Sequence, residues 1–146
     1  MAKASGAVTA YSAARVVLGA ALCAAPARLG RLWLGPVVTE NRAARVAVRS
    51  MGARDALLGV GALLGMRKDA PVRGWLEAAA AADAIDAFST LAAGNGLPVT
   101  GRVLVPVFGL AGAATGAWLA GRAGDGTTMA GAGIPGAGSI PAGATT

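Results

Sequence analysis

Two aspartates lie in the middle of an apolar segment that is long enough to cross a lipid bilayer. Asp83 and Asp86 interrupt the run from Trp75 to Ala93, which is otherwise rich in alanine. Ionisable side chains at membrane depth are costly, and they usually face a protein interior or a water-filled cavity. The segment therefore restricts the chain to folds in which other elements cover these two carboxylates.

The composition favours a membrane protein. Of the 146 residues, 55% are hydrophobic, 14% are charged and only 4% are aromatic. A soluble protein of this composition would have few large side chains with which to fill a core, whereas membrane helices pack closely through small residues. We therefore expect one membrane domain over residues 1–122.

Four apolar segments predict an all-α, four-transmembrane-helix bundle, because each is near the length of about 20 residues that a membrane-spanning helix needs. Pro26, Pro71 and Pro98 lie in the connections between them. Pro106 lies inside the fourth segment near its start, where a missing N–H is tolerated best. The predicted spans are Ala7 to Ala25, Ala47 to Met66, Trp75 to Ala93 and Val103 to Ala120.

The two ends of the chain allow further interpretations. The first span is also consistent with a cleaved secretory signal, since Lys3 and Arg15 precede a short apolar run. Pro26 can equally end a retained helix, which we prefer. Residues 123–146 consist mostly of Gly, Ala, Thr, Ser and Pro, so we expect a flexible, disordered tail.

The connection between the first two spans should lie at the membrane surface. Trp33 has the character of an interfacial anchor. Thr39 and Glu40 resemble a helix start, and the arginines that follow recur on one helix face that would reach the lipid headgroups. The spans have five Lys and Arg residues at one side and six at the other, which predicts no orientation.

The net charge of +6 suggests anionic lipid headgroups as the partner of this chain. Nucleic acid is not expected, because the basic residues fall between apolar segments and no aromatic and basic stacking platform accompanies them. A second copy of the chain or another membrane protein is a further partner that such helices suggest.

The charges inside the spans match in depth. Arg15 and Asp83 each lie roughly ten residues from the side shared by the first and third connections, and Arg54 and Asp86 roughly seven, or about 15 and 10 Å at the helical rise. Asp83 and Asp86 are three residues apart and share one helix face. We therefore predict that Arg15 pairs with Asp83, and Arg54 with Asp86.

Asp55 either closes this network or faces the lipid boundary, because it points about 100° away from Arg54 around the helix. Two arginines and three aspartates leave a net charge of −1, which predicts a protonated carboxyl or a bound cation. One interpretation is that the charges fix helix register. The other is a site that binds or passes a proton, a cation or a small polar ligand.

Small residues four apart predict close helix packing at two places. In so glycine-rich a chain they specify no particular dimer, and we take Gly52, Gly59 and Gly109 to be uninformative alone. An alternative function is a structural or accessory subunit that packs against a larger membrane complex through its glycine faces. The predicted packing residues are Gly61, Gly65, Gly112 and Gly116.

Few features indicate an enzyme, and we predict no catalytic residues, metal or cofactor. The chain contains no histidine, which excludes histidine-dependent triads and the usual zinc sites. Asp83 and Asp86 invite comparison with CDP-alcohol phosphotransferases, but Ala87 stands where that motif needs glycine. The single cysteine, Cys23, cannot form an internal disulfide.

A set of short motifs resembles a bacterial family of small four-helix membrane proteins of unknown function. The resemblance covers about residues 10 to 120 and implies topology and recurring polar positions, but no activity. It implies a multi-pass protein of a bacterial plasma membrane. The motifs are Ala14-Arg15, Leu18-Gly19, Gly52-Ala53-Arg54-Asp55, Leu58-Gly59 and the stretch from Asp83 to Asp86.

Overall fold

The computed structural model describes residues 2–125, which form helices joined by short connections. No strand occurs in that range, so the prediction of an all-α fold is confirmed for it. The elements are α1 (Ala2–Ala24), α2 (Pro26–Leu34), α3 (Val37–Glu40), α4 (Arg42–Arg67), α5 (Arg73–Ala93), the 3-10 helix η1 (Gly94–Gly96) and α6 (Val99–Asp125).

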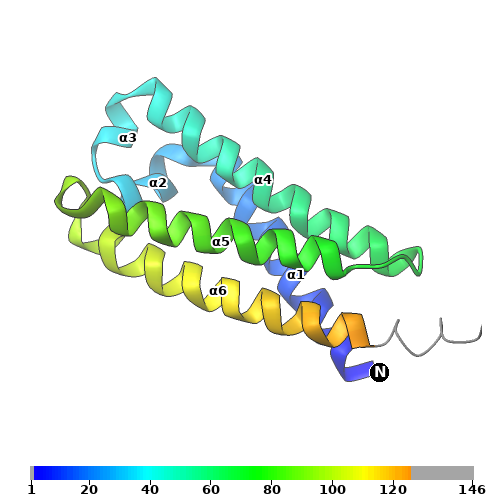
Figure 1. The fold of residues 1–146 in the computed structure, drawn as a ribbon. Coiled ribbons are helices and arrows are strands. Elements are labelled where there is room, and N and C mark those ends of the chain that lie inside the picture. Colours follow the sequence, from blue (N-terminus) through cyan, green and yellow to red (C-terminus); the bar gives the residue numbers. More distant parts are fainter. Residues whose placement is uncertain (1, 126–146) are drawn as a thin grey trace, which may run out of the picture.

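The long helices α1, α4, α5 and α6 lie side by side and alternate in direction (Figure 1). The short helices α2 and α3 and the α5–α6 connection lie at one end of the bundle. The N-terminus, the α4–α5 connection and the end of α6 lie at the other. The first and third connections therefore share a side, as the comparison of depths assumed.

Two of these helices, α1 and α6, are long and apolar enough to cross a membrane, over Ser5–Ala24 and Val99–Ala123. Only 22% of the most apolar window in each is buried inside the protein. Large apolar side chains are also exposed on α4 and α5, including Leu57, Ile85 and Phe88.

The long helices form two closely packed pairs, α1 with α4 and α5 with α6, and the pairs touch each other less extensively. Glycines allow the first pair to approach at the backbone. A Cβ on Gly52 would lie 2.6 Å from the carbonyl oxygen of Gly19, and one on Gly59 would press on α1 at Ser12. Gly52 and Gly59, uninformative alone in the sequence, thus have a packing role that depends on the partner helix.

Each glycine predicted to pack helices lies close to another part of the chain, and Gly61, Gly65 and Gly116 are buried. Gly61 accommodates the ring of Trp75, and Gly65 faces Val72. On α6, a Cβ on Gly112 would collide with the carboxylate of Asp83, and one on Gly116 would lie 3.2 Å from the carbonyl oxygen of Leu76. These glycines thus make room for side chains as much as for backbone.

The start of α4 differs from the predicted one at Thr39 and Glu40, which belong to α3. Asn41 is the N-cap: its side-chain oxygen accepts hydrogen bonds from the backbone N–H groups of Ala43 at 2.8 Å and Ala44 at 3.3 Å. Asparagine is among the strongest N-cap residues, and extended backbone at Asn41 turns the chain into the helix.

Helix α2 crosses the end of the bundle, where Trp33 donates a hydrogen bond from Nε1 to the hydroxyl of Thr90 on α5, at 3.2 Å. The backbone of Trp33 also packs directly on Gly101 of α6. Gly35 then reverses the chain with a φ of +69°, and a Cβ there would lie 2.7 Å from the ring of Pro98. Glycine fits because it adopts positive φ without steric cost.

The last helix is longer than predicted at both ends. It begins at Val99, so Pro106 is its eighth residue and lies in the helix interior, not near the start. The missing N–H leaves the carbonyl of Arg102 without its usual helical donor. The helix continues through Asp125, which overlaps the predicted tail by three residues. The rest of that predicted tail, residues 126–146, lies outside the described residues.

Candidate functional site

Arg15 lies at the centre of a polar cluster between the two helix pairs. Its guanidinium donates from Nη1 to Asp83 of α5 at 2.6 Å and from Nη2 to Asp55 of α4 at 2.9 Å. Arg15 is 8% exposed and Asp55 is 9% exposed. A nearly buried charge needs such partners, because leaving it unpaired would cost several kcal/mol.

Arg54 forms the second half of the cluster. It holds the Asp86 carboxylate with two nitrogens, Nη2 to Oδ2 at 2.6 Å and Nη1 to Oδ1 at 3.2 Å. Its Nη2 also lies 3.1 Å from Oδ1 of Asp55. The two pairs that equal depth predicted, Arg15 with Asp83 and Arg54 with Asp86, are therefore ion pairs, and Asp55 joins them instead of facing outward.

Tyr11 is a member of the cluster that sequence reasoning missed. Its hydroxyl lies 3.1 Å from Nη1 of Arg15 and 3.4 Å from Oδ2 of Asp83, and it donates to the carbonyl of Gly112 at 3.3 Å. The sequence spacing could have placed Tyr11 in the cluster, because Tyr11 precedes Arg15 by four residues and so shares its helix face. Tyr11 connects α1 to both α5 and α6.

Hydrogen bonding in the cluster is uneven. Among the described residues, every hydrogen bond to Asp55 goes to Oδ1 and every one to Asp83 goes to Oδ2. Each of these two aspartates thus retains one oxygen that can accept from a ligand. Within residues 2–125, Nε of Arg15 and the hydroxyl of Ser12 are buried without a hydrogen-bond partner.

A cavity of about 570 Å³ lies against the cluster. Arg15, Asp55, Asp83 and Asp86 contribute its charged wall, and leucine, valine, phenylalanine and tryptophan side chains from α1, α2, α4 and α6 contribute most of the rest. An apolar pocket with a few convergent polar groups is the usual form of a small-molecule site. This size falls within the range of such pockets.

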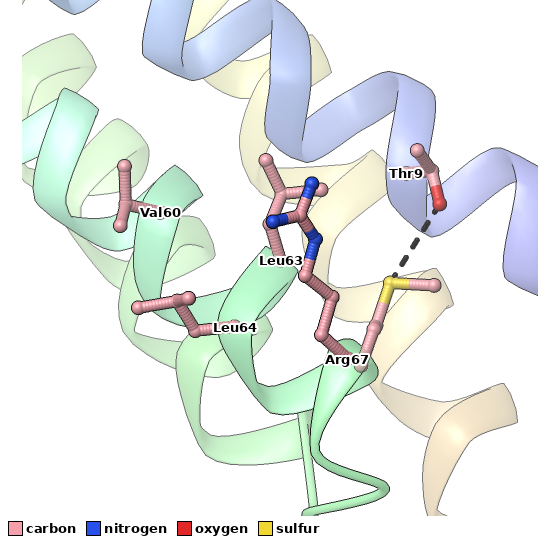
Figure 2. Close-up of a pocket in the computed structure, with 6 residues that line it drawn as sticks. Thr9, Val60, Leu63, Leu64 and Arg67 are labelled. Carbon is pink, nitrogen blue, oxygen red and sulfur yellow. Dashed lines mark hydrogen bonds between the residues drawn. The ribbon is translucent and has the colours of Figure 1, made fainter.

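A second cavity, of about 410 Å³, lies between α1 and α4 near the opposite end of the bundle. Figure 2 shows Thr9 on α1 opposite α4, which contributes Val60, Leu63, Leu64 and Arg67, with the Arg67 guanidinium beside Leu63. The hydroxyl of Thr9 lies 3.7 Å from the sulfur of Met66. None of the described residues that line this cavity is a carboxylate, which makes it a poorer candidate for a cationic ligand.

The fold and the cluster define an all-α protein in which two helix pairs are joined by buried ion pairs around an apolar cavity. Comparison with protein-family models, with curated proteins and with solved structures finds no match for this chain. The resemblance to a bacterial membrane family therefore stays a prediction. Within residues 2–125, no group of three or more acidic or cysteine side chains is arranged to hold a metal ion.

Proposed function

We propose that the chain is a multi-pass protein of a bacterial plasma membrane, and that α1, α4, α5 and α6 all cross the bilayer. Their lengths of 23, 26, 21 and 27 residues support this proposal. At 1.5 Å per residue, each reaches the roughly 30 Å of a hydrocarbon core.

The distribution of apolar side chains supports the same proposal. A core helix of a soluble protein would be mostly buried, whereas the apolar windows of α1 and α6 are only 22% buried. Phe108 is 70% exposed and Leu57 is 67% exposed. Soluble monomers rarely expose continuous apolar surfaces of this extent, while lipid-facing helices must.

The distribution of charge explains why α4 and α5 are less apolar than the other two helices. Their central charges, Arg54, Asp55, Asp83 and Asp86, are in ion pairs inside the bundle. Arg15, at the centre of α1, belongs to the same ion-pair network. The remaining charged residues of the described chain lie in the first or last third of a long helix, in α2 or α3, or in a connection. A span whose only central charges are paired inside can face lipid with its apolar side.

Reporter fusions test the four-span arrangement. A reporter after Arg67 and another after Gly96 should lie on opposite sides of the membrane, because α5 separates these positions. A further fusion after Leu34 should agree with the one after Gly96. If the reporters after Arg67 and Gly96 lie on the same side, the four-span proposal is wrong.

We further propose that the cluster binds a cation, or the cationic head of a small polar ligand. The observation that carries this proposal is the cavity wall, where Asp55 and Asp83 each keep one unoccupied acceptor oxygen. Three carboxylates against two guanidinium groups leave one negative charge when all are ionised. A cation placed beside these oxygens would balance that charge.

Equilibrium binding of methylammonium and butylammonium to the purified protein tests this function. Asp83→Asn removes the excess negative charge and should weaken binding at least tenfold. Glu77→Gln is the matched control, because it removes a carboxylate from the same helix at an exposed pair with Arg73. The cation site is ruled out if neither amine binds saturably, or if the two variants bind alike.

Fewer observations support the alternative function, an accessory subunit of a larger membrane complex. Gly61, Gly65, Gly112 and Gly116 would offer small-residue docking faces only if exposed, and each contacts another part of this chain. The exposed apolar surface is the feature that favours this second candidate. Its test is copurification of one membrane protein at fixed stoichiometry from mild detergent.

A further inference from the structure

The cavity beside the cluster opens through the outer surface of the bundle. Four of its lining side chains, Leu18 of α1, Leu32 of α2, and Leu104 and Phe108 of α6, are between 40% and 70% exposed. The charged wall comes from α1, α4 and α5, behind this apolar rim. The cavity therefore has a polar end inside and an apolar mouth outside.

Two contacts bound the mouth along the helices. At one end, the hydroxyl of Tyr11 on α1 donates to the carbonyl of Gly112 on α6. At the other end, α2 fills the space, with the backbone of Trp33 packed on Gly101. Between these contacts, Ala14 and Leu18 of α1 line the cavity, as do Leu104 and Phe108 of α6. The opening thus lies on the flank of the bundle and not at its tip.

From this geometry we infer that the ligand is an amphiphilic amine, with one cationic, hydrogen-bond-donating head and an apolar body. This inference rests on the proposed function, since a flank opening faces hydrocarbon only if α1 and α6 span the bilayer. The head donates to the unoccupied oxygens of Asp83 and Asp55 and balances the excess negative charge of the cluster. The body fills the space between α1, α2 and α6 and reaches the lipid through the mouth.

Charge and wall chemistry select this class of ligand. An anionic amphiphile would place a second negative charge beside an already negative cluster. A neutral amphiphile would leave the negative charge of the cluster unbalanced. A small inorganic cation would leave the apolar part of the cavity unused, although leucine and phenylalanine side chains make up much of its lining.

Tryptophan fluorescence offers a local test, because Trp33 lines the cavity and Trp118 does not. Trp118 is 51% exposed on α6 and stacks on Arg122. Two proteins, one retaining only Trp33 and one only Trp118, are made with Trp→Phe changes elsewhere and placed in nanodiscs of phosphatidylcholine. The probe is 8-bromooctylammonium, whose bromine quenches a tryptophan that it touches.

We expect saturable quenching of Trp33 that octylammonium reverses and that octanol and octanoate do not. Trp118 should be quenched only in proportion to the probe dissolved in the lipid. Equal, unsaturable quenching of the two tryptophans would overturn the inference, and so would equal displacement by octanol or octanoate.

Substitutions at the mouth separate this inference from the cation site. Ala14→Phe fills the rim at an exposed position and should weaken octylammonium binding at least tenfold, while Ala20→Phe, exposed on α1 outside the cavity, should not. If methylammonium binding depends on Asp83 but octylammonium binds Ala14→Phe as tightly as the unchanged protein, the inference of an amphiphilic ligand is wrong and the cation site stands. If 8-bromooctylammonium quenches Trp33 equally in Asp83→Asn, the cation site itself fails.

Discussion

Arg15 and Asp55 form an ion pair of 2.9 Å between α1 and α4, and the same Oδ1 oxygen of Asp55 lies 3.1 Å from Arg54. Each arginine also holds a different aspartate of α5. The cluster is therefore one connected unit and not two separate pairs. It joins the α1–α4 pair to the α5–α6 pair where the two pairs otherwise touch little.

A double-mutant cycle on Arg15→Ala and Asp83→Asn should reveal strong coupling. Arg15→Ala leaves Asp83 without its guanidinium partner and should lower the free energy of unfolding by roughly 3–5 kcal/mol. Asp83→Asn should cost less, because Arg15 keeps its ion pair with Asp55. The double change should cost less than the sum, because the unpaired Asp83 carboxylate is then absent. Unfolding in a neutral detergent, followed by circular dichroism, measures all four proteins.

The matched control for that cycle is the exposed pair of Arg73 and Glu77, four residues apart on α5. Exposed pairs of this kind contribute about 0.3–0.5 kcal/mol. Additive losses at Arg15 and Asp83, or a coupling no larger than in this control, would show that their ion pair does not stabilise the fold.

Gly52→Leu should disrupt the α1–α4 pair. The new side chain would have to enter the space held by the carbonyl of Gly19, so the helices must separate. The expected loss is several kcal/mol, as for overpacked sites at which backbone must move. Gly121→Leu is the control, because nothing lies within 4 Å of a Cβ at Gly121. Equal stability of the two variants would contradict the close approach of α1 and α4.

Asn41→Ala should lower the free energy of unfolding by about 1 kcal/mol, the usual cost of losing an N-cap. The side chain satisfies the N–H groups of Ala43 and Ala44, which have no helical acceptor. Thr39→Ala tests the start that the sequence suggested and should cost less, since its hydroxyl bonds only to the carbonyl of Pro36. The reverse order of losses would place the cap at Thr39.

Much of the cluster followed from the sequence, because helical rise converts residue number into depth. Arg15 and Asp83, at equal depth from a common side, had few other partners for a buried charge. The role of Asp55 stayed open, because direction around a helix depends on how its neighbours are placed. Tyr11 was not predicted to join the cluster, because a tyrosine within an apolar segment is usually interpreted as a packing residue.

The contacts that depend on two distant segments were beyond the sequence. Gly19 and Gly52 matter only as a pair across α1 and α4, and no local pattern records that crossing. The cavity likewise depends on distant segments, because residues of α1, α2, α4, α5 and α6 line it together. Periodicity predicts helices, whereas the gap between them depends on tertiary packing.

Two arginines share one oxygen of Asp55, and this limits how the cluster can change during evolution. A chain that lost Asp86 would leave Arg54 with only a share of Asp55, and Arg15 would then compete for it. Substitutions at these positions should therefore be accepted in compensating combinations. When relatives of this protein are aligned, the five charged positions should be retained or replaced as a set.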